Sequence, residues 1–145
     1  MKLNHVLTVN ALLALGFGIA FALYGPVMLA FFSVPDIPSD DVLLYWNVAA
    51  FARMFGAALF SFGLLLWAIR GVVGDERTSP GVQRGIVFAL LLANIMSAFI
   101  AISQQFSIWE SLAGWVASAI FLLLLLAYGY LLAVGPNQSL ERSPE

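Results

Sequence analysis

The sequence predicts an all-α polytopic membrane protein, a bundle of four transmembrane helices in up-down order with both termini in the cytoplasm. Hydrophobic residues make up 62% of the 145 residues and charged residues 10%, and the mean hydropathy is +0.97. A soluble domain is about half apolar and about a quarter charged. Several apolar runs are long enough to cross a hydrocarbon core, which takes about 20 helical residues. Most of the six cations lie at or between the ends of those runs.

The apolar runs are interpreted as helices because they are continuous rather than alternating, and because they are rich in Ala and Leu. A backbone in lipid must pair its polar groups within its own segment, which also favours helices. Short connections make neighbouring helices antiparallel. A single domain is predicted over residues 1–134, with spans at about 6–32, 43–69, 85–105 and 108–133 and a short polar tail at 135–145.

The first span begins like a secretion signal, with Lys2, an apolar run and an Ala-x-Ala sequence at residues 20–22. The apolar pattern continues to residue 32, which is longer than a signal core, so we expect a retained helix. Pro26 lacks an N–H group and its ring clashes with the preceding turn. Two interpretations stay open: a kinked helix that continues to residue 32, or a break followed by a short interfacial helix at 26–32.

The cations predict the orientation of the bundle. The connection at residues 33–41 contains three aspartates and no cation, whereas the connection at 70–84 contains three arginines. Arg142 lies in the tail, and the third link contains Glu110 and no cation. Because cytoplasmic loops carry the excess of Lys and Arg, both termini are predicted to be cytoplasmic. Aromatic residues are assigned to belts, with Tyr45, Trp46, Trp109 and Trp115 outside and Trp67, Tyr128 and Tyr130 inside.

Small residues are spaced for close helix approach, as in small-xxx-small patterns of membrane helices. On the second span they are Gly56, Ala57, Ser61 and Gly63, on the first Gly16 and Gly18, and on the fourth Ala113, Gly114, Ala117 and Ser118. Packing inside one bundle is the preferred interpretation, with a homo-oligomer face as the alternative. Asn10 and Asn47 lie near span ends and are given no special role.

Arg53 is the candidate centre of a site, because a guanidinium inside an apolar span costs several kcal/mol unless it finds water or a partner. It lies about ten residues, or roughly 15 Å, from the outer end of its span. Polar residues are predicted at or above its level on the other spans. The candidate ligand- or partner-binding set is Arg53, Tyr24, Asn94, Ser97, Gln104 and Glu110.

Two interpretations of this set are open. In the first, Arg53 anchors an anion or a hydrogen-bonding group in an outward-facing pocket, with Glu110 as the counter-charge. In the second, the network only fastens the helices and satisfies Arg53, because interhelical polar contacts contribute roughly 0.6–2 kcal/mol each.

Several kinds of chemistry have no support in the sequence. Cysteine is absent and His5 is the only histidine, so no protein metal site is predicted. No nucleotide-binding loop, nucleophile–base pair or pair of catalytic carboxylates is present, and no catalytic residue is assigned. The net charge of −2 without a basic cluster predicts no nucleic-acid partner.

The stretch AFARMFGAALFSFGLLLWAIRG, preceded by ALYGPVMLAFFSVPDIP, resembles a pattern in small uncharacterised bacterial four-helix membrane proteins, the DoxX-like and related families. The matching positions are Pro26, Arg53, Gly56, Ala57, Gly63, Leu64, Leu65 and Arg70. The resemblance implies a multi-pass protein of the bacterial inner membrane, and it brings no activity with it.

The preferred functional hypothesis is a non-enzymatic accessory or assembly subunit that packs against a larger membrane complex. The short loops and the apolar fourth span favour it. The alternative is a binder, carrier or enzyme for a small lipophilic ligand such as a quinone, a lipid or a carotenoid, held around Arg53. Ion or proton transport is less favoured, because a pathway needs ionisable groups at several depths. The expected partners are membrane lipids, a larger membrane complex or a second copy of the chain.

Overall fold

The computed structural model describes residues 2–34, 42–73 and 78–134. These ranges contain helices and no strand: α1 (Leu3–Phe31), α2 (Val42–Val73), α3 (Pro80–Gln104), a π-helical segment η1 (Gln105–Trp109) and α4 (Leu112–Val134). The predicted all-α class is therefore confirmed. Four helices of the described chain, with η1 continuing α3, are long and apolar enough to cross a membrane, as expected of a multi-pass membrane protein.

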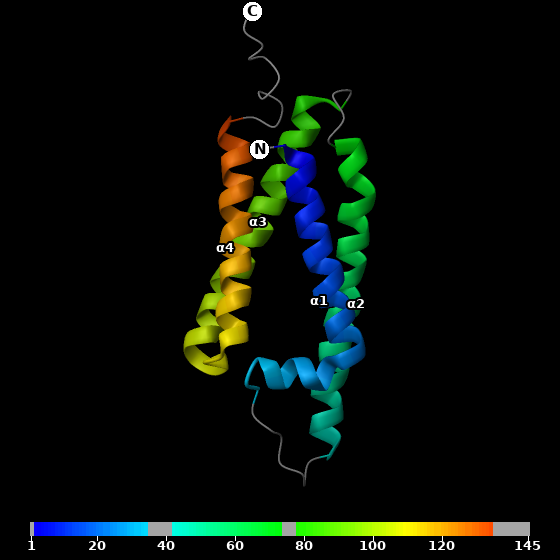
Figure 1. Cartoon of the computed structure of the whole chain (residues 1–145), viewed down its shortest axis with the longest axis vertical. Coiled ribbons are helices and arrows are strands. Elements are labelled where there is room, and N and C mark those ends of the chain that lie inside the picture. Colours follow the sequence, from blue (N-terminus) through cyan, green and yellow to red (C-terminus); the bar gives the residue numbers. More distant parts are fainter. Residues whose placement is uncertain (1, 35–41, 74–77, 135–145) are drawn as a thin grey trace, which may run out of the picture.

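The helices form two hairpins, α1 with α2 and α3 with α4 (Figure 1). Successive helices run in opposite directions, so the start of α1 and the end of α4 lie at the same end of the bundle. We call this the N-terminal end and the opposite end the far end. Between the hairpins, the main contact is made by α1 with α4.

The hydrophobic core lies in the half of the bundle nearest the N-terminal end. All four helices contribute to it, because this is where the two hairpins meet. Its buried members come from the first three turns of α1, the last turns of α2 and α4, and the first half of α3: Leu3, Val6, Leu7, Ala11, Leu66, Val73, Val87, Leu90, Leu124, Tyr128 and Leu131.

Glycines let α1 and α2 approach closely. A Cβ added to Gly18 would lie 2.5 Å from the backbone nitrogen of Phe60, and one added to Gly63 would lie 2.8 Å from that of Leu15. A Cβ added to Gly56 would collide with the backbone nitrogen of Ala22. These three glycines therefore serve packing within the bundle, which is the preferred interpretation from the sequence, and they do so between α1 and α2.

Helix α1 bends sharply near its end. Tyr24 has non-helical torsions (φ −119°, ψ 34°), two residues before Pro26. Residues 25–32, which we call the transverse segment, then run across the bundle rather than along it (Figure 1). The first interpretation expected a kinked helix, and the helix is kinked at Tyr24. The second expected a short separate helix at 26–32, and the last turns do run in a different direction from the rest of α1 (Figure 1).

A C-terminal cap ends the transverse segment. Ser33 adopts the left-handed conformation (φ 53°), and the N–H groups of Ser33 and Val34 donate to Ala30 (3.0 Å) and Leu29 (3.1 Å). These two bonds are the Schellman pattern, which satisfies carbonyls that the helix leaves unpaired.

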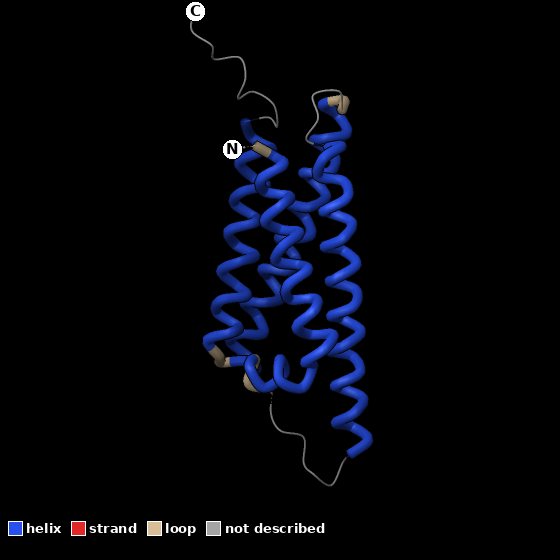
Figure 2. The backbone as a smooth tube through the Cα atoms, turned by 45° about the vertical axis from the view of Figure 1, so that its right-hand side comes forward, coloured by secondary structure: helices blue, strands red, loops and turns tan. Residues whose placement is uncertain are grey.

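Several observed boundaries differ from the predicted spans, and two of them have a local cause. Helix α3 begins at Pro80 rather than 85, because the Ser79 hydroxyl accepts a hydrogen bond from the N–H of Val82 (3.4 Å) and caps the helix. Helix α4 begins at Leu112 rather than 108, because Glu110 takes a left-handed conformation (φ 41°). The far end of α2 extends past the transverse segment (Figure 2).

Candidate functional site

A cavity of about 590 Å³ lies between the two hairpins. Side chains of all four helices and of η1 line it. Along α1 its lining runs from Asn10 to the transverse segment, and the part from Asn10 to Phe21 alone is roughly 16 Å long at helical rise. The cavity thus occupies the half of the bundle that the core leaves unfilled.

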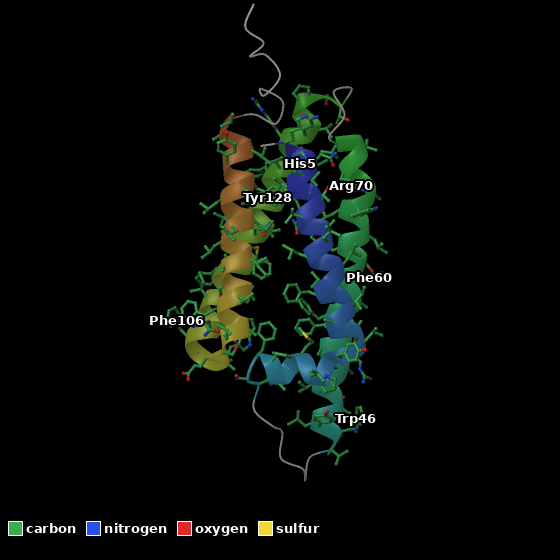
Figure 3. All side chains as sticks on the ribbon, in the orientation of Figure 1. His5, Trp46, Phe60, Arg70, Phe106 and Tyr128 are labelled. Carbon is green, nitrogen blue, oxygen red and sulfur yellow. The ribbon has the colours of Figure 1, made fainter. Side chains whose placement is uncertain are left out.

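A hydrogen bond between the hairpins closes the cavity toward the N-terminal end. The side-chain amide of Asn10 donates to the Tyr128 hydroxyl across 2.8 Å, and both residues are buried. Figure 3 places Tyr128 on α4 within the bundle. Two interpretations from sequence are therefore wrong, since Asn10 was given no role and Tyr128 was assigned to an interfacial belt.

Aromatic side chains close the cavity at the far end. The ring of Phe32, from the transverse segment, lies edge-on to Trp109 of η1 with centroids 4.8 Å apart. Phe32 also contacts Phe21, with centroids 5.8 Å apart. This contact joins the first hairpin to the second, so Trp109 lies against the cavity rather than in a simple outer belt.

The walls are largely apolar, and the spacing of their aromatic residues is visible in the sequence. Phe17 and Phe21 are four residues apart on α1, and Phe51, Phe55 and Phe62 recur at helical spacing on α2. Such spacing places side chains on one face of a helix. The complete aromatic lining is Phe17, Phe21, Phe32, Phe51, Phe55, Phe62, Trp109 and Phe121.

Two of the predicted site residues reach the cavity, Asn94 and Ser97 on α3. Asn94 is buried and donates one amide hydrogen to the carbonyl of Leu90 (2.8 Å). Among the described residues, its carbonyl oxygen and second amide hydrogen have no partner. The half-buried Ser97 lies nearly one turn further along α3. No Lys, Arg, His, Asp or Glu is among the residues lining the cavity.

Arg53 lies outside the cavity and is exposed. Its Cγ atom is 3.2 Å from the position that a Cβ on Gly25 would take, so it is level with the start of the transverse segment. Within the described ranges, it makes no hydrogen bond or ion pair. Tyr24 is also exposed and outside the lining. The predicted gathering of polar groups around Arg53 is therefore not found.

The last two predicted residues, Gln104 and Glu110, do not line the cavity. Gln104 is half-buried at the end of α3, and Glu110 is exposed in the turn before α4. The glutamine that is buried is its neighbour Gln105, whose Oε1 atom faces Gly114 and has no hydrogen-bond partner among the described residues. Neither Arg53 nor Glu110 lines the cavity, and within the described ranges no ion pair joins them, so their pairing stays a prediction.

Within residues 2–34, 42–73 and 78–134, no group of three or more His, Cys, Asp or Glu side chains is placed to hold a metal ion. Comparison with protein-family models, with curated proteins and with solved structures finds no match to this chain. The resemblance to the DoxX-like families stays a prediction, and the candidate site depends on its geometry alone.

Proposed function

We propose that this protein binds a small lipophilic molecule in the cavity between its two hairpins. The observation that carries the proposal is the cavity itself, about 590 Å³ with a largely apolar and aromatic lining. Ligand sites are typically apolar concavities of roughly 300–1,000 Å³ with a few polar groups that orient the ligand. A bound quinone, lipid or carotenoid meets this description, as the sequence-based alternative expected.

The proposal relocates the ligand site predicted from the sequence. The candidate residues are Asn94 and Ser97 with the aromatic lining, and Arg53 is not among them. Arg53 is level with the transverse segment. A guanidinium near a membrane surface meets water and headgroups, so no polar pocket is required to explain it.

We further propose that the helices cross the bacterial inner membrane with both termini in the cytoplasm. The support comes from the arginines at the end of α2 and the start of α3, Arg70 and Arg84. At the N-terminal end, Arg70 lies 3.5 Å above the ring of Trp67 and donates to the Thr8 hydroxyl (3.2 Å). An arginine beside a tryptophan is typical of an interface between membrane and water.

The test is native mass spectrometry of the protein purified in mild detergent from its own membrane. We expect a bound lipophile that is released on unfolding. Ala117 lines the cavity on α4, whereas Ala119 on the same helix is exposed and outside it. Ala117→Trp should remove most of the bound molecule, and the matched Ala119→Trp should leave it in place. If no bound lipophile (the native adduct) is detected, or if both variants retain the same amount of it, the proposal is contradicted.

An accessory role is the second candidate, because the far end of α2 extends beyond its neighbours. Tyr45 and Trp46 are exposed on this end at 39% and 54% of their surface, and Figure 3 shows Trp46 away from the other helices. Exposed aromatic side chains of this kind are common anchors of protein interfaces. This role predicts packing against a larger membrane complex or a second copy of the chain.

The second candidate is tested by the mass of the native assembly. We expect a complex heavier than the single chain in mild detergent, reduced to the single chain by Tyr45→Ser with Trp46→Ser. Mass spectrometry of the assembly separates a foreign partner from a second copy. A single chain in the unmodified protein rejects the accessory role and leaves ligand binding unaffected.

A further inference from the structure

The geometry points to an electrically neutral occupant with a hydrogen-bonding head, such as a lipid alcohol or a quinone, held by Asn94 and Ser97. This inference depends on the proposed function, because it specifies the ligand class of the same cavity. It assigns the two polar side chains of α3 to the head and the phenylalanines of α1 and α2 to the apolar body.

Charge is the first argument. The lining contains no ionisable Lys, Arg, His, Asp or Glu side chain. A carboxylate or phosphate inside it would lose water without gaining a counter-charge, which costs several kcal/mol. Anionic lipid headgroups and fatty-acid carboxylates are therefore disfavoured inside the cavity, whereas neutral heads are accepted.

Unused hydrogen-bonding capacity is the second argument. Asn94 donates one amide hydrogen to Leu90 and leaves an acceptor and a donor without a partner in the described chain. Ser97 is three residues further on, so both side chains lie on one face of α3. Together they can donate to a ligand carbonyl or accept from a ligand hydroxyl.

The location of these groups is the third argument. Asn10 is the other amide in the lining, and it already donates to Tyr128 at the closed end of the cavity. Asn94 and Ser97 instead lie partway along the cavity, on the hairpin opposite Phe17 and Phe55. A head bound to α3 leaves the ligand body against aromatic faces, which favour flat or conjugated groups.

The experiment compares two ligands with the same carbon skeleton, all-trans-retinol with a neutral hydroxyl and all-trans-retinoate with a carboxylate. Each is titrated onto delipidated protein in detergent, and the bound fraction is read by native mass spectrometry. We expect retinol to bind at least about tenfold more tightly than retinoate. Asn94→Leu with Ser97→Ala should weaken retinol binding by about tenfold, the effect of losing one or two hydrogen bonds.

The matched control is Asn47→Leu with Ser61→Ala, which makes the same two changes on α2 at exposed positions outside the lining. It should leave retinol binding unchanged. If the double variant of α3 does not fold, Ser97→Ala alone should still weaken retinol binding by about threefold.

The outcomes separate this inference from the proposed function. Equal binding of retinol and retinoate, or unchanged retinol binding in the α3 variants, overturns the neutral head. A phospholipid as the native adduct, removed by Ala117→Trp, also overturns it and leaves the cavity as a lipid site. If neither retinol nor any native adduct depends on Ala117, both proposals are wrong.

Discussion

At the scale of single residues, the best-defined contact between the hairpins is one hydrogen bond. Asn10 and Tyr128 pair through buried side chains, of which 6% and 0% of the surface is exposed. Such interhelical bonds contribute roughly 0.6–2 kcal/mol in membrane proteins. Asn10 therefore has a structural role that its place near the end of a span did not indicate, because only the fold brings Tyr128 beside it.

Gly56 should be the glycine of α2 that least tolerates a methyl group. The added carbon would collide with the backbone of Ala22, so α1 and α2 would have to separate. We expect Gly56→Ala to destabilise the protein by about 1–3 kcal/mol, the usual cost of overpacking. Thermal or denaturant unfolding in detergent measures this change.

Gly71→Ala is the matched control on the same helix, because an added Cβ there meets nothing within 4 Å. It should be neutral or slightly stabilising, since alanine favours helix more than glycine does. Equal effects of the two substitutions would mean that close contact at Gly56 is unimportant for stability.

Arg53 should be dispensable for both folding and ligand binding. It is exposed and without an ion pair in the described chain, and exposed substitutions usually change stability by less than about 0.5 kcal/mol. We expect Arg53→Gln to keep the unfolding free energy within about that margin and to retain the native adduct. Loss of the bound lipophile in Arg53→Gln would instead support the ligand pocket around Arg53 that the sequence predicted.

Depth along α2 alone does not place Arg53 relative to the other helices. Ten residues from the start of the helix appeared to bury Arg53, but the first turns of α2 extend past the transverse segment. How far one helix extends past another along the bundle axis depends on packing, and the periodicity of apolar residues does not predict it. Asn94 and Ser97 both line the cavity, and the sequence predicts their shared face because spacing along one helix is a local property.

At the scale of elements, the transverse segment is the most informative feature. Pro26 predicted a disturbance of the first helix, and apolar runs predicted all four helices. The direction taken after the kink, and the π-helical segment at Gln105–Trp109, were not predicted. Both features lie at the far end of the bundle, where Phe32 of the transverse segment packs against Trp109 of η1.

The contact between Phe32 and Trp109 can be tested by cross-linking, because the chain contains no cysteine. We expect Phe32→Cys with Trp109→Cys to be joined efficiently by a short bismaleimide. The control pair is Phe32→Cys with Phe106→Cys, since Phe106 packs on Trp115 and is outside the cavity lining. A gel shift in the control pair alone would show that the far end is arranged differently.

At the scale of the whole molecule, two hairpins meet through a shared core at one end and leave a partly open cavity between them toward the other. Close glycine contacts make the first hairpin compact. Aromatic rings and two buried hydrogen bonds, from Asn10 to Tyr128 and from Gln83 to the carbonyl of Val73, link it to the second. The closely packed glycines of α1 and α2 face the opposite helix within the first hairpin, whereas most phenylalanines of the same two helices line the cavity toward the second hairpin. This division of roles explains why a chain this short can contain a cavity without losing its core.

The proposed orientation predicts which ends of the bundle a membrane-impermeant maleimide reaches in intact cells. Glu110→Cys at the far end should be labelled from outside, because Glu110 is exposed in its turn. Thr78→Cys at the N-terminal end should be labelled only after the cells are opened. The reverse pattern would invert the bundle in the membrane without changing the fold.

The off-centre position of the cavity has a consequence for how its contents are exchanged. In a bilayer, the filled half of the bundle would stand in one leaflet and the hollow half in the other. In the proposed orientation, a molecule that diffuses sideways out of the lipid would then reach Asn94, which lines the cavity, from the non-cytoplasmic leaflet only. The protein would sample the composition of that single leaflet, and asymmetry between the two sides of the membrane would decide what it carries.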